Sequence, residues 1–510
     1  MEKSSKLEQQ LFKYFHLREF RAGQKEIIRD ILQGKDVLGV LPTGSGKSIC
    51  YQLPAMMTRG LTIVVSPLIA LMIDQVKRMK AIGLKRVAAV NSFLQAEERR
   101  YILQRLDEYK LLFVSPETLQ QRQFLDQICN IHVHTFVIDE AHCISQWGYE
   151  FRPDYMRLGE VIEKLGNPTV LALSATATEE VQRDIIHVLK KPGINRHIYP
   201  IDKENLVFMT EKVENENEKL ESILSLIARC SGPVLVYFSS RQMAEKIASH
   251  ISRRSQKRVA AYHGGLEQLD RLLIQQQFML GQLDVVCCTS AFGMGIDKSD
   301  IRMVIHYHMP PDIKSYIQEA GRAGRDGKKS LCVLFYAEHD EFLLQQLVDM
   351  EIPSEELITQ AVQVFKNVDK YLPDFQEESF IRLLGLTESQ WHFLQNQFEK
   401  HDMMIGHHHL FNEKQWKIIE AGMQSQASSR RTQKKKRVYE MLAFIHTDKC
   451  LRAALYRHFQ SDFTQTPICC NNCGFSFSDL DFPVKQSARE LEAPWKQKLR
   501  DLMLINDTDE

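Results

Sequence analysis

"DVLGVLPTGSGKSICYQL", residues 36 to 53, joins a short apolar run to a glycine-rich loop and then to an amphipathic segment. The pattern predicts a buried strand, a tight loop and a helix in that order. Gly44 and Gly46 leave space for backbone N–H groups to point at phosphate oxygens, and the helix N-terminus adds partial positive charge. A turn that binds nothing is the alternative, and the strand before it and helix after it argue against that. The stretch therefore predicts an α/β fold built around a phosphate site.

The side chains of this loop suit a nucleoside triphosphate and its metal ion. Lys47 would reach the β and γ phosphates, and the hydroxyl of Ser48 would bind Mg²⁺. Thr43 and Ser45 are the remaining nucleotide-binding candidates in the loop. ATP and Mg²⁺ are the predicted cofactors.

Apolar runs alternate with longer amphipathic segments from about residue 35 to 200, and again from 230 to 340. Such runs are typical of buried parallel strands joined by crossover helices, so two tandem α/β lobes are expected. After about residue 345 the sequence predicts a mainly helical C-terminal region with a metal-binding module. The expected units are lobe one with the ATP site (1–200), lobe two (201–345), a helical and winged-helix-like region (346–428), a cysteine-containing zinc module (429–480) and a tail (481–510).

The 510 residues are too many for one hydrophobic core. Lysine plus arginine equals aspartate plus glutamate at 65 each, so any nucleic-acid surface must be local. The N-terminal "MEKSSKLEQQ" lacks the apolar core of a signal peptide, and no apolar run approaches the roughly 20 residues that span a bilayer. A cytoplasmic protein without membrane contact is expected.

An acidic pair and an aromatic loop follow one another in "TFVIDEAHCISQWGYEFRPDY", residues 135 to 155. Asp139 closes an apolar strand, where open α/β sheets bind ligands, and would hold Mg²⁺. Glu140 would orient and deprotonate the attacking water.

The loop behind the pair combines three aromatic side chains with a basic one: Trp147, Tyr149, Phe151 and Arg152. Flat aromatic faces can stack on bases, at roughly 1 to 3 kcal/mol per base, and the arginine can meet a phosphate or stack. Packing into a domain core is the alternative, but the glycine and proline in the loop argue against a regular buried element.

"YIQEAGRAGRDG", residues 316 to 327, supplies Gln318, Arg322 and Arg325 to the second lobe. Arginines three apart lie on one face if the segment is helical. An arginine that reaches across a cleft can stabilise the charge on a transferred phosphoryl group. A surface loop with solvated arginines is the alternative.

With "FRAGQ" (20–24), "SAT" (174–176), "YHGG" (262–265) and "TSAFGMGIDK" (289–298), these motifs resemble the core of a superfamily-two helicase. The order of the motifs over about residues 10 to 340 resembles the RecQ family, and in particular its shorter bacterial (RecS-type) members without the terminal helical domain. The resemblance implies two RecA-like lobes and an ATP-dependent DNA helicase. It further implies movement in the 3′ to 5′ direction on single-stranded DNA, and a role in DNA recombination and repair. The implied partners are single-stranded and tailed or forked DNA, with single-strand-binding or repair proteins as candidates, and the implied location is the bacterial nucleoid.

The resemblance also assigns roles to individual residues. Gln24 would read adenine, and Arg21 belongs to the same motif. Ser174 and Thr176 would link hydrolysis to movement of the strand, and the aromatic loop would couple DNA to the ATP site. The remaining strand contacts or lobe couplers are Ser66, Pro67, residues 114–117, residues 239–241, His263 and Thr289.

Four of the 11 cysteines lie close together near the C-terminus: Cys450, Cys469, Cys470 and Cys473. In a reducing compartment such a cluster favours a metal over disulfides. The resemblance implies Zn²⁺ held by one helical cysteine and a CxxCxxC run; Ser476 stands at the last position of that run, and Cys469 is the available substitute. A structural zinc is expected, reduced free thiols are the alternative, and His458 is a further candidate ligand.

The helical region holds a helix, a glycine turn and a second helix over residues 377–405, with Thr387 as the N-cap of the second. A DNA-binding helix-turn-helix and two packed core helices are both compatible with this pattern. Residues 407–419 could form a wing strand, whose three histidines would be solvated or bind metal. Residues 425–437 read as a basic, polar linker, and the tail as a docking helix or a frayed end.

Two other functions compete with a DNA helicase. An RNA helicase is one, because DEAH-containing cores also act on RNA. A scaffold that binds DNA through its C-terminal half without catalysis is the other, and it would require decayed ATPase motifs, which the sequence does not contain.

Overall fold

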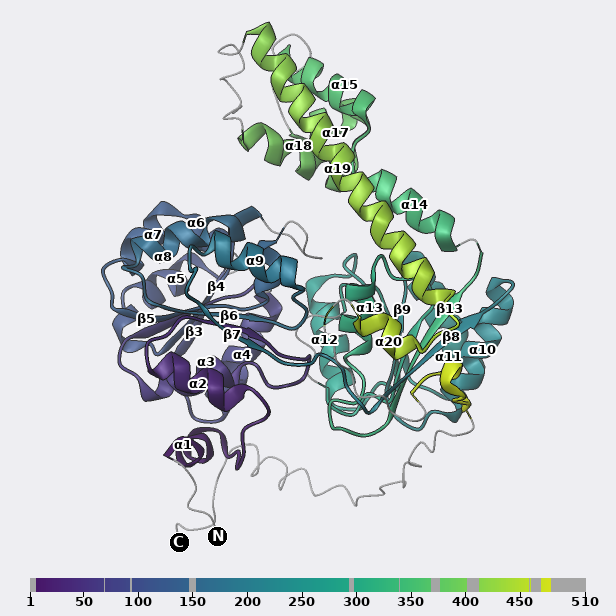
Figure 1. The fold of residues 1–510 in the computed structure, drawn as a ribbon, viewed down its shortest axis with the longest axis horizontal. Coiled ribbons are helices and arrows are strands. Elements are labelled where there is room, and N and C mark those ends of the chain that lie inside the picture. Colours follow the sequence, from purple (N-terminus) through teal and green to yellow (C-terminus); the bar gives the residue numbers. More distant parts are fainter. Residues whose placement is uncertain are drawn as a thin grey trace.

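The computed structural model describes residues 6–67, 69–91, 94–145, 153–292, 298–338, 340–367, 377–400, 412–457, 459 and 469–477. Two α/β lobes lie side by side, and a helical arm rises from the second lobe (Figure 1). Two parallel-sheet lobes, a helical region and a cysteine cluster confirm the predicted fold class.

The first lobe contains, among the described residues, a seven-stranded sheet in the order β3-β4-β2-β5-β6-β1-β7, with every neighbour parallel. Its strands are β1 (Val37–Val40), β2 (Leu61–Val65), β3 (Val87–Val90), β4 (Leu111–Val114), β5 (Val133–Ile138), β6 (Thr169–Ser174) and β7 (Asn195–Ile198). Its helices are α1 (Lys6–Phe15), α2 (Gln24–Leu32), α3 (Ile49–Met57), α4 (Ile69–Ala81), α5 (Ala96–Leu103), α6 (Pro116–Gln120), α7 (Arg122–Ile128), α8 (Leu158–Lys164) and α9 (Glu179–Val188), with 3₁₀ turns η1 (Leu106–Glu108), η2 (Ala141–Ile144) and η3 (Pro153–Arg157). The central strands β1, β2 and β4 are buried along their whole length, because helices cover both faces of the sheet.

The second lobe repeats this plan with a described six-stranded parallel sheet in the order β10-β11-β9-β12-β13-β8. Its strands are β8 (Leu206–Lys212), β9 (Val234–Tyr237), β10 (Val259–Tyr262), β11 (Val285–Cys288), β12 (Met303–His306) and β13 (Ser330–Tyr336). Its helices are α10 (Glu216–Arg229), α11 (Arg241–Arg254), α12 (Gln268–Met279) and α13 (Ile313–Ala320). The chain crosses from edge strand β7 of one sheet to edge strand β8 of the other through residues 199–205, called the interlobe linker below.

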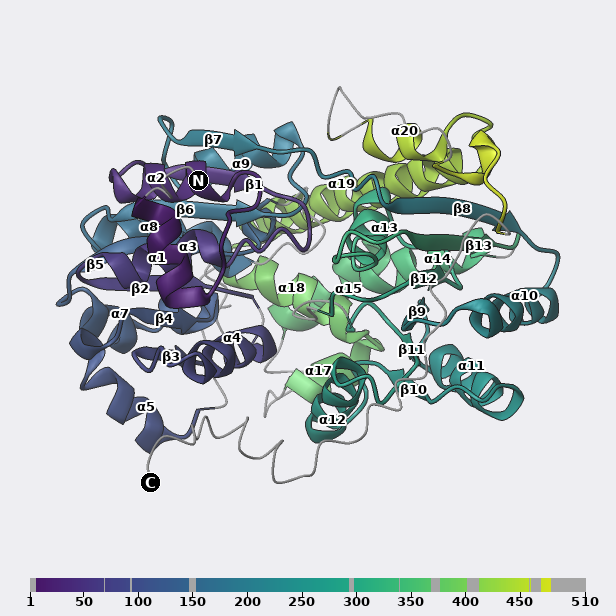
Figure 2. The ribbon, with the colours of Figure 1, turned by 90° about the horizontal axis from the view of Figure 1, so that it is seen from below.

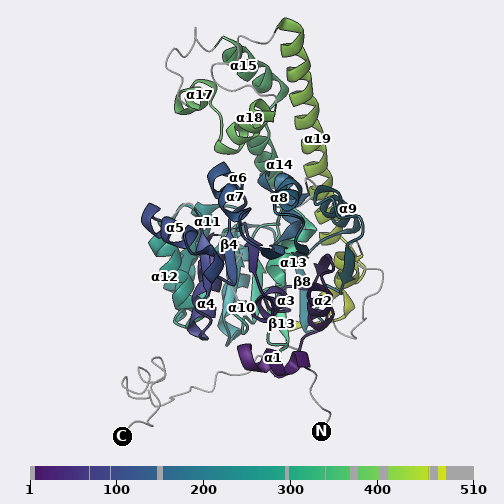
Figure 3. The same ribbon diagram turned by 90° about the vertical axis from the view of Figure 1, so that its left-hand side faces the viewer.

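The arm is formed by α14 (Asp340–Glu351), α15 (Glu355–Lys366), α17 (Glu377–Leu384), α18 (Glu388–Lys400) and the upper part of α19 (Glu413–Ile445). It has its own core, in which the Phe365 ring stacks on Phe398 at 4.3 Å between centroids and Trp416 packs beside them. Figure 3 shows the arm standing clear of both sheets. Thr387 caps α18 as predicted: its hydroxyl accepts from the Gln390 N–H at 3.2 Å.

Helix α19 corrects three expectations. Its 33 residues include the whole segment 425–437, which was expected to be a linker, and the boundary expected between residues 428 and 429 falls inside it. Residues 413–419 form its first turns instead of a wing strand; the three histidines lie outside the described residues. Asn412 is the N-cap of this helix and forms a capping box with Gln415.

The cysteine-containing segments form a small module on the edge of the second lobe. It consists of α20 (Leu451–Tyr456) and the 3₁₀ turn η5 (Asn471–Cys473), and Figure 2 shows α20 beside β8. The Phe208 N–H of β8 donates to the Cys469 carbonyl at 3.1 Å. The Thr210 N–H donates to Oδ1 of Asn471 at 3.4 Å, and the Asn471 amide donates to the Thr210 carbonyl at 3.1 Å. The module thus covers the free edge of the β8 strand.

Among the described helices, none has the length and apolar content to span a bilayer.

Candidate functional site

The phosphate loop lies between β1 and α3, as predicted. Gly44 and Gly46 have φ angles of 78° and 75°, in the left-handed region that favours glycine. The Nζ atom of Lys47 lies 3.8 Å from the Oε1 atom of Glu140, so the loop and the acidic pair face one another. A Cβ atom on Gly44 would lie 2.9 Å from Cγ of Arg325, which places an arginine of the second lobe directly against the loop.

The first-lobe segment "FRAGQ" braces this loop. The Gln24 amide donates to the carbonyls of Ser45 at 2.8 Å and Gly46 at 3.0 Å, and the Arg21 guanidinium donates to the Gly44 carbonyl. Both side chains thus lie at the loop, beside the position expected for a nucleotide. Their assigned role in reading adenine stays a prediction.

The acidic pair follows β5. The Asp139 N–H is bonded to the Val65 carbonyl of β2, and the Tyr155 hydroxyl donates to the Asp139 carbonyl at 3.3 Å. The Glu140 N–H donates to Oδ1 of Asp139 at 3.0 Å. These bonds fix both carboxylates at the carboxyl end of the strand, the edge where α/β sheets bind ligands.

The surroundings shift the pKa values of the two carboxylates in opposite directions. Burial, reinforced by the charge of Glu140, raises the pKa of Asp139 to about 7. Burial also opposes ionisation of Glu140, but Lys47, His142 and the two arginines of the second lobe together hold its pKa below the ordinary value. The neighbouring cations therefore favour the ionised form of Glu140.

The second lobe contributes Gln318, Arg322 and Arg325. Gln318 is buried on α13, but that helix ends at Ala320, so both arginines lie in the turns after the helix rather than on a helical face. The segment is not helical at the arginines, so the condition for a shared helix face is not met. Both arginines still lie close enough to Glu140 to lower its pKa, which brings the second lobe to the site.

The donor set of the cleft fits a nucleotide with a hard divalent cation. The Asp139 carboxylate and the Ser48 hydroxyl are oxygen ligands of the kind that Mg²⁺ prefers. Lys47, Arg322 and Arg325 supply the positive charge that a triphosphate needs. These side chains therefore match the ligands that a nucleotide and its metal ion require.

His142 is a site residue that motif reasoning did not single out. It is buried, and its Nδ1 atom lies 3.1 Å from the Ser174 hydroxyl and 3.4 Å from Oε2 of Glu140. Ser174 in turn accepts from the Thr176 N–H at 3.3 Å. This chain of contacts joins the segment predicted to link hydrolysis to movement with the carboxylate of Glu140.

The expected strand contacts fall into three groups. Ser239 and Thr289 line a cavity of about 440 Å³ between the second lobe and α19. His263 is buried and bonded to Glu245 at 2.8 Å, and Ser66 is buried at the end of β2. The predicted aromatic loop with Trp147, Tyr149, Phe151 and Arg152 lies outside the described residues.

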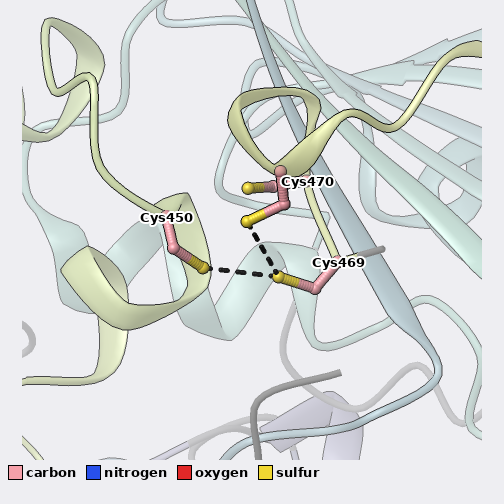
Figure 4. A group of neighbouring side chains, drawn as sticks. Cys450, Cys469 and Cys470 are labelled. Atoms are coloured by element: carbon pink, nitrogen blue, oxygen red, sulfur yellow. Dashed lines mark hydrogen bonds between the residues drawn. The ribbon is translucent and has the colours of Figure 1, made fainter. Parts of the chain in front are cut away.

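The four predicted cysteines meet in one cluster. The ligand atoms of Cys450, Cys469, Cys470 and Cys473 all lie within 4.8 Å of one another. The sulfur of Cys450, at the start of α20, faces that of Cys469 at 3.3 Å (Figure 4), and Cys469 lies 3.8 Å from Cys473. The Leu451 N–H donates to the Cys470 sulfur at 3.4 Å.

This geometry fits one tetrahedral zinc ion. Four Zn–S bonds of about 2.3 Å place the sulfurs about 3.8 Å apart, close to the spacings in the cluster. Four thiols also fill every position of a structural site. Ser476 is not needed as a ligand, and His458 lies outside the described residues.

Two further residues near the cleft belong to no motif. Lys203 of the interlobe linker donates to the Gly321 carbonyl at 2.6 Å, next to Arg322. Arg452 on α20 is completely buried and is bonded to the same linker. Their partners lie 118 and about 250 residues away in the chain, so no local pattern could have revealed them.

Three family models match the chain in order. They are the DEAD/DEAH box helicase over residues 21–184, the helicase conserved C-terminal domain over 217–327, and RecQ zinc-binding over 400–475. They coincide with the first lobe, the second lobe, and a C-terminal stretch that includes α19 and the cysteine cluster.

Relatives with curated descriptions agree with these models. The chain is 40% identical to a protein of Bacillus subtilis described as a probable ATP-dependent DNA helicase RecS, over 99% of both chains. It is 42% identical to the ATP-dependent DNA helicase RecQ of the same organism, over 68% of this chain and 59% of the relative.

Solved structures share the fold at low sequence identity. The helicase MrfA bound to DNA matches with a TM-score of 0.56 and 20% identity, over 68% of this chain and 50% of that one. The helicase Mss116 bound to single-stranded RNA matches with the same TM-score and 16% identity, over 77% and 88%. At these identities the likeness shows the fold alone, and it does not separate DNA from RNA.

Proposed function

The chain belongs to the RecQ family of ATP-dependent DNA helicases, and from this premise we propose that it moves along single-stranded DNA in the 3′ to 5′ direction and unwinds tailed or forked duplexes. The observation that carries the proposal is the divided nucleotide site. Lys47 and Glu140 come from the first lobe, and Arg325 of the second lobe packs on Gly44. A nucleotide held there is bound by both lobes at once.

Each side chain has a role in this scheme. Lys47 would bind the β and γ phosphates, and Ser48 with Asp139 would hold Mg²⁺, which neutralises phosphate charge when bound. Glu140 would accept the proton of the attacking water. Arg322 and Arg325 would stabilise the charge on the transferred phosphoryl group, and Gln318 would support them from α13.

Movement follows from the divided site. Binding of ATP draws the lobes together through the arginines, and product release lets them part. The expected strand contacts on both lobes, among them Ser66 on the first and Ser239 and Thr289 on the second, would then advance in alternation. We assign the protein to DNA recombination and repair at the bacterial nucleoid, with single-strand-binding or repair proteins as partners, on the strength of the family resemblance.

The decisive experiment compares ATP hydrolysis without nucleic acid, with single-stranded DNA and with single-stranded RNA. Stimulation by DNA in the wild type and its loss in Lys47→Ala are expected. Strand displacement is then measured on duplexes with a 3′ or a 5′ single-stranded tail. Displacement of the 3′-tailed duplex alone supports the proposed direction, displacement of the 5′-tailed duplex alone reverses it, and stimulation by RNA alone points to an RNA helicase.

A further inference from the structure

The interlobe linker is bonded into the nucleotide cleft through Lys203. Its Nζ atom donates to the Gly321 carbonyl at 2.6 Å. The same carbonyl accepts from the Thr43 hydroxyl of the phosphate loop at 3.0 Å. One oxygen atom of the second lobe therefore joins the first lobe, the linker and the segment that carries the arginines.

Gly321 is a sensitive point because the turns that carry Arg322 and Arg325 begin there. Helix α13 ends at Ala320, so these turns lack the continuous helical bonds that would hold them in place. The space at this glycine is also fully used, since a Cβ atom there would lie 2.4 Å from the Thr43 hydroxyl. The turns that carry Arg322 and Arg325 are called the arginine turn below. A hydrogen bond to the Gly321 carbonyl thus fixes the position at which the arginine turn starts.

The linker that carries Lys203 is itself held by Arg452. This guanidinium is completely buried and pairs with Asp202. It also donates to the carbonyls of Lys203 at 2.9 Å and Glu204 at 3.4 Å, and to that of Leu206. A planar group with several donors in fixed directions is suited to holding an irregular backbone in one conformation.

The charge around Lys203 supports a role at the cleft. Burial, together with Arg325, Arg322 and Arg21, lowers the pKa of Lys203 to about 7. A linker lysine that served only to join two lobes would gain stability from an exposed position, away from three arginines. Here the amino group is instead kept beside the arginines that lie against the phosphate loop.

We propose that Lys203 is a positioning residue for ATP hydrolysis: it holds the Gly321 carbonyl and thereby places Arg322 and Arg325, while Arg452 of the cysteine-containing module holds the linker in register. The inference rests on the proposed function and adds to it two residues that lie in none of the helicase motifs. Neither side chain needs to touch the nucleotide.

The test replaces Lys203 by methionine, which keeps the aliphatic stem and removes the donor. Lys212→Met is the matched control, because Lys212 is an exposed lysine on β8 that pairs only with Glu338 at 3.4 Å among the described ion pairs. We expect kcat for DNA-stimulated hydrolysis to fall on the order of tenfold or more in Lys203→Met, since small misplacements of catalytic groups carry large rate penalties. The KM for ATP should stay within about twofold, and Lys212→Met should match the wild type.

A double-mutant comparison separates positioning from general damage. If Lys203 acts through the arginine turn, Lys203→Met should add less than about twofold to the loss in an Arg325→Ala background, measured in single-turnover reactions at high enzyme concentration. Arg452→Lys keeps the charge opposite Asp202 but loses the forked carbonyl contacts, and should lower kcat with an unchanged zinc content. Thermal unfolding of each variant shows whether it is folded.

The outcomes are distinct. A wild-type kcat in Lys203→Met overturns the inference, and so does a fall that is undiminished in the Arg325→Ala background. Hydrolysis that is absent from the wild type, with or without DNA, refutes the proposed function and the inference together.

Discussion

At the scale of single residues, Glu140 has a rare backbone conformation and lies at the centre of the candidate nucleotide site. Its φ and ψ are both 48°, a left-handed conformation that is strained for a residue with a side chain. The bond from its N–H to Asp139 and the contacts of its carboxylate with Lys47 and His142 hold it there. In this conformation the Glu140 carboxylate lies 3.8 Å from Nζ of Lys47 in the candidate nucleotide site.

Glu140→Gln should therefore abolish hydrolysis without abolishing nucleotide binding. The amide keeps the shape but cannot accept the proton, so we expect kcat to fall about 10²- to 10⁴-fold. Steady-state hydrolysis and the binding of a fluorescent ATP analogue measure the two effects separately. Wild-type kcat in this variant would remove Glu140 from the role of base.

His308 should make the fold sensitive to acid. Burial lowers the pKa of His308 from 6.5 to about 4, consistent with the Ser239 N–H donating to its Nδ1 atom at 3.2 Å. Between these values the unfolded chain binds more protons than the folded one, so stability is lost as the pH falls from 6.5 towards 4. The expected loss between pH 7 and pH 5 is about 2 kcal/mol.

Urea unfolding at pH 7 and pH 5 measures this loss, with His308→Asn as the comparison. The asparagine amide oxygen can accept the same N–H bond but does not titrate. Its stability should fall less over this range than that of the wild type. Equal losses in both proteins would assign the acid sensitivity to other groups.

The sequence predicts site residues best where one short segment carries the chemistry. Lys47, Asp139, Glu140, Arg322 and Arg325 all stand in compact motifs, and the structure brings them to one cleft. Sequence reasoning missed residues that matter through distant contacts. Lys203, for example, lies in a polar linker whose letters carry no sign of the Gly321 carbonyl 118 residues away.

At the scale of elements, α19 connects the arm to the second lobe. Its first half packs in the core of the arm through Trp416, Ile419 and Met423, and its last turns pack against the second lobe through Met441 and Phe444. The ten residues between Ala427 and Val438 contain no buried apolar side chain. They contact α14 through polar groups instead.

This arrangement explains why the sequence of the basic segment predicts a linker and not a helix. Helix prediction relies on a repeating apolar face, and the middle of α19 has none. Arg431 donates to the Ile352 carbonyl at 3.0 Å, and Lys434 pairs with Glu351. The helix is continuous there because its two ends are anchored, and that can be known only from the folded chain. The α17–α18 pair could be predicted because the turn residue Gly385 and the cap Thr387 lie next to the helices in the sequence.

Thr432→Pro should kink helix α19 between the arm and the second lobe. Thr432 is exposed in the middle of α19, so a proline acts through the backbone alone and should cost about 3 kcal/mol. We expect a kink that changes the distance between fluorescent labels on the arm and the second lobe. Thr432→Ala is the control, and it should leave that distance unchanged.

At the scale of the whole molecule, the cysteine cluster joins parts that are far apart in the chain. Its residues lie against β8, and its helix α20 carries the arginine that holds the interlobe linker. A bound zinc ion would thereby stabilise the edge of one lobe and the connection between both. The fold class and lobe order could be predicted from sequence, but this placement could not, because it depends on contacts across about 250 residues.

Cys470→Ser should lose the metal and destabilise the second lobe. Elemental analysis should give one zinc per wild-type chain and almost none in the variant, with a lower melting temperature, because three remaining thiols bind zinc weakly. Cys129→Ser, at an exposed cysteine outside the cluster, should change neither quantity. A full zinc content in Cys470→Ser would show that another ligand replaces it.

The pairing of β8 with the last described segment also bears on how the protein is made. Thr210 is bonded to Asn471, which leaves the ribosome 261 residues later, or roughly 13 to 50 seconds at 5 to 20 residues per second. During that interval β8 would present an uncovered strand edge, the kind of surface on which chains stick to one another. Slow translation, or a stop codon before residue 469, should therefore favour aggregation over release of a shorter working motor.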